Sequence, residues 1–156
     1  MSTRRSRPKG PGARVARVLP RPPRKAKVDG ARTIASEASA KVALLAAQAG
    51  LEKKASAIEI IDVVGKVDYA DYLVLMTGSS DRHVAALADA VDELLGKNDV
   101  RSISIEGRPA ASWVLIDFVD VVVHIFQHEA RAVYDIDGLW MDARRLPIPG
   151  ASQEKS

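Results

Sequence analysis

Two histidines four residues apart, His124 and His128, are the pair in the chain whose spacing first suggests metal binding. On a helix this spacing would place both imidazoles on one face, where they could share an ion. His124, however, lies in the apolar run 121–126, which has the length and β-branched content of a strand. Four residues of strand span about 13 Å, which is too far for two side chains to chelate one ion. The spacing therefore argues against a metal site, and His124 is expected to be a hydrogen-bonded or interface residue.

The tripeptide Gly78-Ser79-Ser80, between a predicted strand and a predicted helix, could cradle a phosphate at a helix N-terminus. It lacks the lysine and glycine spacing of a P-loop and the three glycines of a dinucleotide fingerprint. Nucleotidyl transfer would also need two carboxylates one residue apart on a following strand, to hold magnesium. The acids that follow fall instead on a predicted helix: Asp89, Asp92 and Glu93. We interpret Gly78 as a turn residue and Ser80 as a helix N-cap, and identify no catalytic residue.

Five of the seven aromatic residues of the chain fall within residues 113–140. Tryptophan, tyrosine and arginine are enriched where protein interfaces concentrate their binding energy, and acidic side chains suit a basic partner. The candidate partner-binding residues are Trp113, Asp117, Asp120, His124, Phe126, Arg131 and Tyr134. The alternative is that Trp113 and Phe126 belong only to the core. Truncation of Tyr134 or Arg131 is expected to weaken binding without unfolding the domain, and truncation of Trp113 to do both.

The elements that position these residues follow from hydrophobic periodicity and helix-cap signals. We predict a helix, two strands, a helix and three strands at residues 35–49, 57–63, 71–77, 81–95, 100–106, 113–116 and 121–126. A helical turn at 127–132 and an extended piece at 133–136 follow. Thr33 or Ser36 is expected to cap the first helix and Gly50 to end it, while Ile103 and Ile105 point inward. The last two strands form an antiparallel hairpin. This order predicts an α/β or α+β fold, a mixed sheet of about five strands flanked by helices.

Charge and composition divide the chain into a basic tail and an acidic domain. Residues 1–28 carry ten Lys or Arg, five of the eight prolines and no acid, and the remainder has a balance of 13 − 20 = −7. We predict a disordered tail at 1–30, a domain at 31–148 and a second disordered tail at 149–156. The basic tail either only solvates the protein or contacts RNA phosphates without sequence preference. A transit peptide fits less well, because the prolines interrupt an amphipathic helix.

The sequence gives no sign of a membrane or secreted protein. No apolar run reaches the roughly 18 residues of a membrane span, and the N-terminus lacks the apolar centre of a secretory signal. Cysteine is absent, so neither a disulfide framework nor a thiolate metal site can form. A cytoplasmic location without cofactors is therefore expected.

Several segments, in this order, match one known family: KKASAIEIIDV (53–63), ADYLVLMTGSSDRHVAALAD (70–89), EG (106–107), WVLIDFVDVVVHIF (113–126) and RAVYDIDGLW (131–140). On these motifs the chain resembles the ribosomal silencing factors, the Iojap-like proteins. The resemblance implies a fold similar to that of nucleotidyltransferases but used without catalysis. It also implies binding to ribosomal protein L-fourteen on the large subunit, which blocks subunit joining and lowers translation when nutrients are short. Members of the family often form homodimers.

The chain departs from the family pattern at two positions. Val119 stands where the family usually has glycine in the hairpin turn, and Asp137 stands where glutamate is usual. Because a β-branched residue disfavours positive φ, we expect a type I or wider turn at Val119. The alternative function is a nucleotide-handling enzyme on the same fold. Magnesium-dependent nucleotide binding would favour the enzyme, and co-sedimentation with large ribosomal subunits would favour the silencing factor.

Overall fold

The computed structural model of the protein describes residues 36–150. The expected tail at residues 1–30, and residues 151–156 of the expected C-terminal tail, lie outside this range. The elements run in the order α2 (Glu37–Glu52), β1 (Ser56–Asp62), β2 (Tyr72–Gly78), α3 (Asp81–Lys97), β3 (Ser104–Glu106), β4 (Trp113–Asp117), β5 (Val121–Gln127), α4 (His128–Tyr134) and α5 (Ile136–Leu139). No helix in this range is long and apolar enough to cross a bilayer.

The five strands form one mixed sheet in the order β1-β2-β5-β4-β3. The central pair, β2 and β5, is parallel, and the other three pairs are antiparallel. The predicted mixed five-stranded sheet and the predicted β4–β5 hairpin are therefore confirmed. Because β5 lies at the centre of the sheet, it has paired strands on both sides and holds the hairpin firmly in place.

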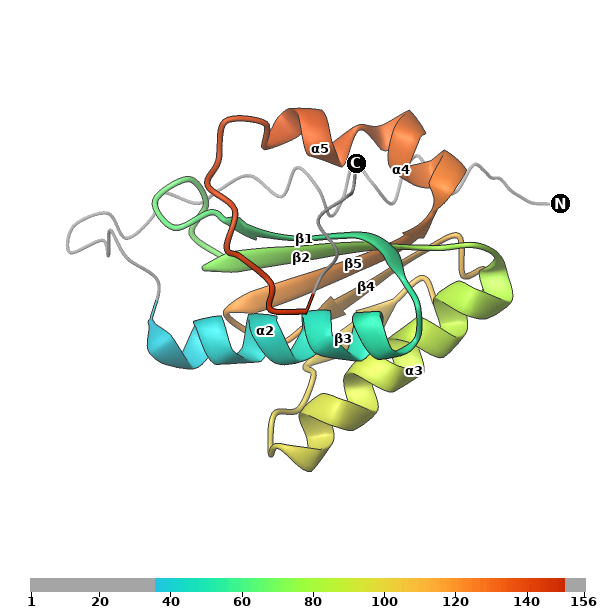
Figure 1. Cartoon of the computed structure of the whole chain (residues 1–156), viewed down its shortest axis with the longest axis horizontal. Helices are drawn as coiled ribbons and strands as arrows, with labels where there is room; N and C mark the ends of the chain where they lie inside the picture. The colour runs from blue at the N-terminus through green and yellow to red at the C-terminus, as the bar shows by residue number, and fades with distance from the viewer. Residues whose placement is uncertain (1–35, 151–156) are drawn as a thin grey trace, which may run out of the picture.

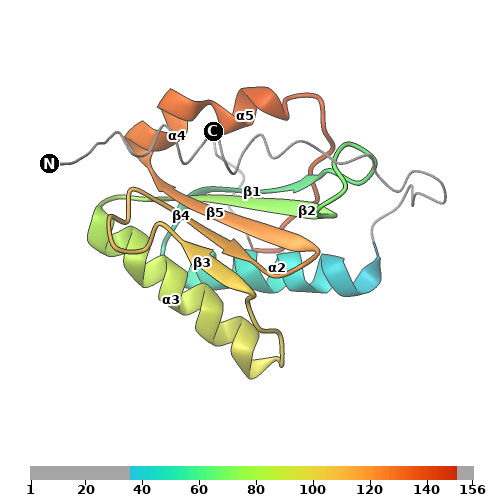
Figure 2. The ribbon, with the colours of Figure 1, turned by 180° about the vertical axis from the view of Figure 1, so that it is seen from behind.

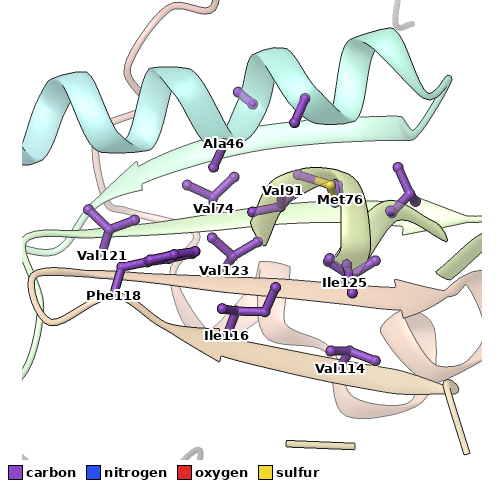
Figure 3. Packing of buried hydrophobic residues seen from close by; sticks show 14 of the residues in the cluster. Ala46, Val74, Met76, Val91, Val114, Ile116, Phe118, Val121, Val123 and Ile125 are labelled. Atoms are coloured by element: carbon purple, nitrogen blue, oxygen red, sulfur yellow. The ribbon is translucent and has the colours of Figure 1, made fainter. Parts of the chain in front are cut away.

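Helices cover both faces of the sheet (Figures 1 and 2): α2 and α3 lie on one face, and α4 and α5 lie on the other. Figure 3 shows the core on the α2–α3 face, where alternate residues of β2, β4 and β5 meet the two helices. A second core lies on the α4–α5 face and contains Leu73, Leu75, Val122, Phe126 and Ile136. These two cores explain why β2 and β5 are apolar at nearly every position rather than at every second one.

The two long helices begin where their caps predict. The Ser36 side chain accepts from the backbone N–H of Ser39 at 3.0 Å, and Ser80 does the same for His83 at 3.1 Å. The end of α2 differs from the prediction, because Gly50 lies inside the helix and not after it. A Cβ on Gly50 would stand 2.8 Å from the sulfur of Met76, so glycine here allows α2 to pack closely on β2.

Two other sequence expectations prove wrong. Residues 133–136 are not extended, because α4 continues to Tyr134 and α5 starts at Ile136. Asp135 joins the two helices with a left-handed backbone (φ 50°), and its carboxylate accepts from Gly138 N–H to cap α5. Strand β3 starts only at Ser104, and Ile103 before it points outward, with 64% of its surface exposed. Ile105 packs against the core as predicted.

The hairpin turn also differs from the type I or wider turn predicted for it. Val119 has φ 79°, and the Asp120 N–H donates to the Phe118 carbonyl at 3.1 Å, the i→i+2 bond of a γ-turn. The carboxylate of Asp117 accepts from the Val119 N–H at 2.9 Å, and Phe118 is buried beside the turn. These contacts hold a β-branched residue in a backbone region that normally favours glycine, which strains the turn.

Val119→Gly is expected to raise the free energy of unfolding by about 1 kcal/mol. Relief of a strained positive φ stabilises the folded state by roughly 1–3 kcal/mol. The added freedom of glycine in the unfolded chain lowers stability by about 0.5–1 kcal/mol. Little burial is lost, since 54% of the Val119 surface is exposed. Urea denaturation measures the change. Val119→Ala, which keeps a Cβ, should fall between wild type and Val119→Gly. A glycine variant less stable than wild type would show that the turn is unstrained.

Candidate partner-binding face

Four side chains from three elements meet on the α4–α5 face of the sheet. In the sheet, Trp113 of β4 lies directly opposite Phe126 of β5, and Leu115 lies opposite His124. The side chains of these four strand residues therefore share one face. The Trp113 ring lies 4.9 Å from that of Tyr134 on α4, 5.4 Å from that of Phe126 and 5.8 Å from that of His124, measured between centroids. We call Trp113, His124, Phe126 and Tyr134 the aromatic cluster. The structure thus brings together four of the seven candidate residues.

The members of the aromatic cluster differ in exposure. Phe126 is fully buried and His124 is 4% exposed, so neither can be a main contact for a partner. Trp113 and Tyr134 are half-buried and reach the surface. The expectation that Phe126 forms part of the surface is therefore corrected, and its core alternative holds. The reason is that α4 packs against β5, whereas Trp113 lies one strand further out on β4.

Two acidic candidates lie at the hairpin end of β4. Asp117 is half-buried and shares the face of Trp113 and Leu115, because side chains on a strand alternate between its two sides. Asp120 is exposed in the turn. Together the surface residues Trp113, Leu115, Asp117 and Tyr134 form what we call the aromatic face, with Asp120 at its edge.

Sequence reasoning missed two residues at this face. Leu115 lies between Trp113 and Asp117 on the same side of β4, and Glu106 of β3 is its cross-strand partner. Both are half-buried. The period-two alternation of a strand would have identified Leu115, once Trp113 was assigned to the binding side. Glu106 carried no such signal, since its position depends on how β3 pairs with β4.

Arg131 lies inside the domain, in contrast to the surface role expected from the sequence. It is 8% exposed. Its guanidinium donates two hydrogen bonds of 2.8 Å to the Asp137 carboxylate, one of 2.7 Å to the Ala57 carbonyl and one of 2.9 Å to the Thr77 hydroxyl. A register shift in β1 between Ser56 and Glu59 lies next to this carbonyl. Hydrogen bonds from Arg131 lower the pKa of Asp137. Arg131 therefore fastens α4 and α5 to the sheet.

His124 is held as a neutral imidazole. Its Nδ1 accepts a hydrogen bond of 3.2 Å from the indole Nε1–H of Trp113. Burial is the larger cause and the positive charge of Arg131 the smaller one, and together they lower the pKa of His124 to about 3. His128 is exposed at the start of α4. No cluster of His, Cys, Asp or Glu within residues 36–150 could hold a metal ion.

The Gly78-Ser79-Ser80 segment is accounted for by the start of α3. A Cβ on Gly78 would stand 2.9 Å from Val84, and the Ser79 N–H donates to Nδ1 of His83 at 2.9 Å. The downstream acids line α3, where Asp89 pairs with Arg108 and Glu93 with Lys97. These contacts agree with the interpretation of the segment as a turn and helix cap.

The structure is a small α+β domain in which two half-buried aromatic side chains, Trp113 and Tyr134, lie together on the face that also carries Asp117. A family model described as "Ribosomal silencing factor during starvation" matches residues 36–156. The chain belongs to this family.

Individual relatives agree with this assignment. The ribosomal silencing factor of Bacillus subtilis is 37% identical over 99 residues, which cover 64% of this chain and 84% of the relative. The mouse protein named "Mitochondrial assembly of ribosomal large subunit protein 1" is 32% identical, over 57% of this chain and 40% of its own length. A crystal structure of a Chromobacterium violaceum protein superimposes with a TM-score of 0.65 at 29% identity, covering 74% of this chain and 96% of that one. The names of the two relatives describe ribosome-associated roles and not enzymes.

Proposed function

We propose that this chain binds the large ribosomal subunit through ribosomal protein L-fourteen in the cytoplasm. Binding would block the joining of the two subunits and lower translation when nutrients are limiting. Membership of the silencing factor family supports the ribosomal role. The observation that supports a binding mechanism is the aromatic face, where the contacting rings of Trp113 and Tyr134 reach the surface.

Blocking a large partner requires a firm surface, because a mobile one would lose binding energy to ordering. The aromatic face meets this requirement. The ring centroids of Trp113 and Tyr134 lie 4.9 Å apart, and the Trp113 ring also contacts that of Phe126, which is fully buried. Rigid aromatic side chains with few rotatable bonds are typical interface hot spots. The function proposed for the domain is therefore steric and needs no chemical step.

Acidic side chains beside the aromatic rings would orient a basic partner on this face. Asp117 and Asp120 lie at the hairpin end of the aromatic face, and residues 29–156 together carry a net charge of −7. An acidic surface favours a basic ribosomal protein over exposed RNA and speeds the encounter at low salt. The basic residues 1–28, which the structure does not describe, are proposed to contact ribosomal RNA without sequence preference.

Tyr134→Ala is expected to weaken co-sedimentation with large ribosomal subunits by about tenfold. Truncation of a hot-spot ring costs more than roughly 1 kcal/mol of binding, and each 1.4 kcal/mol is tenfold in affinity. Because Tyr134 is only half-buried, the melting temperature should fall by a few degrees at most. Sedimentation at several protein concentrations gives the affinity, and a thermal melt gives the stability.

Glu93→Ala serves as the control, since Glu93 is exposed on α3 across the sheet from α4. It should bind as wild type does. The wild-type protein should also reduce the joining of purified small and large subunits, and Tyr134→Ala should do so less. Wild-type protein that fails to co-sediment with large subunits, or Tyr134→Ala protein that binds unchanged, would contradict the proposal.

A further inference from the structure

His124 is a polar residue buried mainly among apolar side chains, with Arg131 close enough to act on it through its charge. Its neighbours on the α4–α5 face of the sheet are Leu75 of β2, Leu115 of β4 and Phe126 of its own strand. Burial of an imidazole among such residues costs free energy unless its polar atoms are satisfied. A leucine would fill this position at lower cost. The presence of histidine therefore calls for a role.

Three common roles of histidine do not fit this site. At 4% exposure His124 has no surface to offer a partner. Within residues 36–150 there is no cluster of ligands that could bind a metal with it. Burial, and to a smaller extent the charge of Arg131, lowers its pKa to about 3. This pKa lies below the range in which a physiological pH sensor works.

What remains is its hydrogen bond with Trp113. The indole Nε1–H is a donor only, and Nδ1 of His124 accepts from it at 3.2 Å. Acceptance at Nδ1 places the proton of the neutral ring on Nε2. The rings of Phe126 and Tyr134 also contact Trp113, but ring contacts have shallow orientation preferences. The hydrogen bond is directional and defines which edge of the indole faces inward.

We propose that His124 is a positioning residue that fixes the indole of Trp113 in the orientation it presents on the aromatic face. Its effect on binding rests on the proposed function, whereas its effect on Trp113 does not. The neutral state of His124 keeps the Nδ1 lone pair available throughout the physiological pH range.

The first test observes the indole directly. In the ¹⁵N-labelled full-length chain the indole N–H signals come from Trp113 and Trp140, and Trp140→Phe assigns them. His124→Leu should move the Trp113 signal and speed its exchange with water by about fivefold, the factor that corresponds to one neutral hydrogen bond. His124→Asn, whose side-chain oxygen can replace Nδ1 as acceptor, should restore the signal. An unchanged Trp113 signal in His124→Leu protein would overturn the proposal.

The second test asks whether His124 acts through Trp113. His124→Leu should weaken co-sedimentation with large subunits by about fivefold, and His124→Asn should recover most of it. In a Trp113→Phe background, which keeps an aromatic ring but removes the donor, His124→Leu should have no further effect. An equal loss in both backgrounds would overturn the positioning role. Should wild-type protein not bind subunits at all, the proposed function fails, and the indole signals alone decide the role of His124.

Discussion

Arg131→Ala is expected to lower the free energy of unfolding by about 2–4 kcal/mol, because it leaves the Asp137 carboxylate without its ion-pair partner. Removal of one partner from a buried ion pair costs roughly 3–5 kcal/mol, and the 41% exposure of the Asp137 side chain reduces this figure because water can solvate the carboxylate left behind. The Thr77 hydroxyl and the Ala57 carbonyl would also lose a donor. Urea denaturation at neutral pH measures the loss.

Arg108→Ala provides the matched control, because Arg108 forms an exposed ion pair with Asp89. Such pairs contribute about 0–1 kcal/mol, so this variant should unfold close to wild type. Arg131→Lys should fall between the two, since lysine keeps the charge but cannot form the two parallel bonds to Asp137. If Arg131→Ala unfolds like wild type yet binds large subunits poorly, Arg131 is the surface anchor that the sequence indicated.

The parts of the fold that sequence predicts well are those with local signals. Ser80 and the apolar spacing after it define the start of α3, and two β-branched runs define the β4–β5 hairpin. Each signal lies within the element that it specifies, so no knowledge of distant contacts is needed. For α2 the local signal allowed two caps, Thr33 or Ser36, and the structure shows that Ser36 is the cap.

The parts that sequence predicts poorly depend on distant or competing contacts. The enrichment of arginine at interface hot spots predicts a surface role for Arg131, but its acceptor Ala57 lies 74 residues earlier in the chain. The β-branched and aromatic residues at 133–136 favour a strand. The left-handed Asp135 and its cap on Gly138 instead start α5, whose first residue, Ile136, is buried. In the hairpin turn, the bond from the Val119 N–H to the Asp117 carboxylate and the bond from the Asp120 N–H to the Phe118 carbonyl override the preference of valine for negative φ.

The candidate site shows the same division. Of the five aromatic residues in 113–140, Trp113, Phe126 and Tyr134 lie in one cluster, whereas Phe118 packs in the core on the other face. Sequence could not say which rings reach the surface, because exposure depends on where α4 lies across the sheet. That placement, fixed by Arg131, buries Phe126 and leaves Trp113 and Tyr134 half-exposed.

Acidification from pH 7 to pH 5 is expected to destabilise the wild-type domain by about 2 kcal/mol more than the His124→Leu variant. The pKa of His124 is about 3 in the folded protein and about 6.5 in the unfolded chain. Between these values the unfolded state binds one proton more than the folded state. Stability therefore falls as pH decreases below 6.5, by about 1.4 kcal/mol per pH unit for this one group. Urea denaturation at pH 7, 6 and 5 measures the dependence.

The pH window separates the contribution of His124 from that of Asp137. The pKa of Asp137 is lowered by Arg131, so its contribution to stability is complete above its ordinary pKa and is lost only as pH falls below about 4. The other histidines are present in both proteins and cancel in the comparison. Parallel curves for wild type and His124→Leu would mean that His124 is protonated in the folded domain, and a protonated Nδ1 could not accept the hydrogen bond from Trp113.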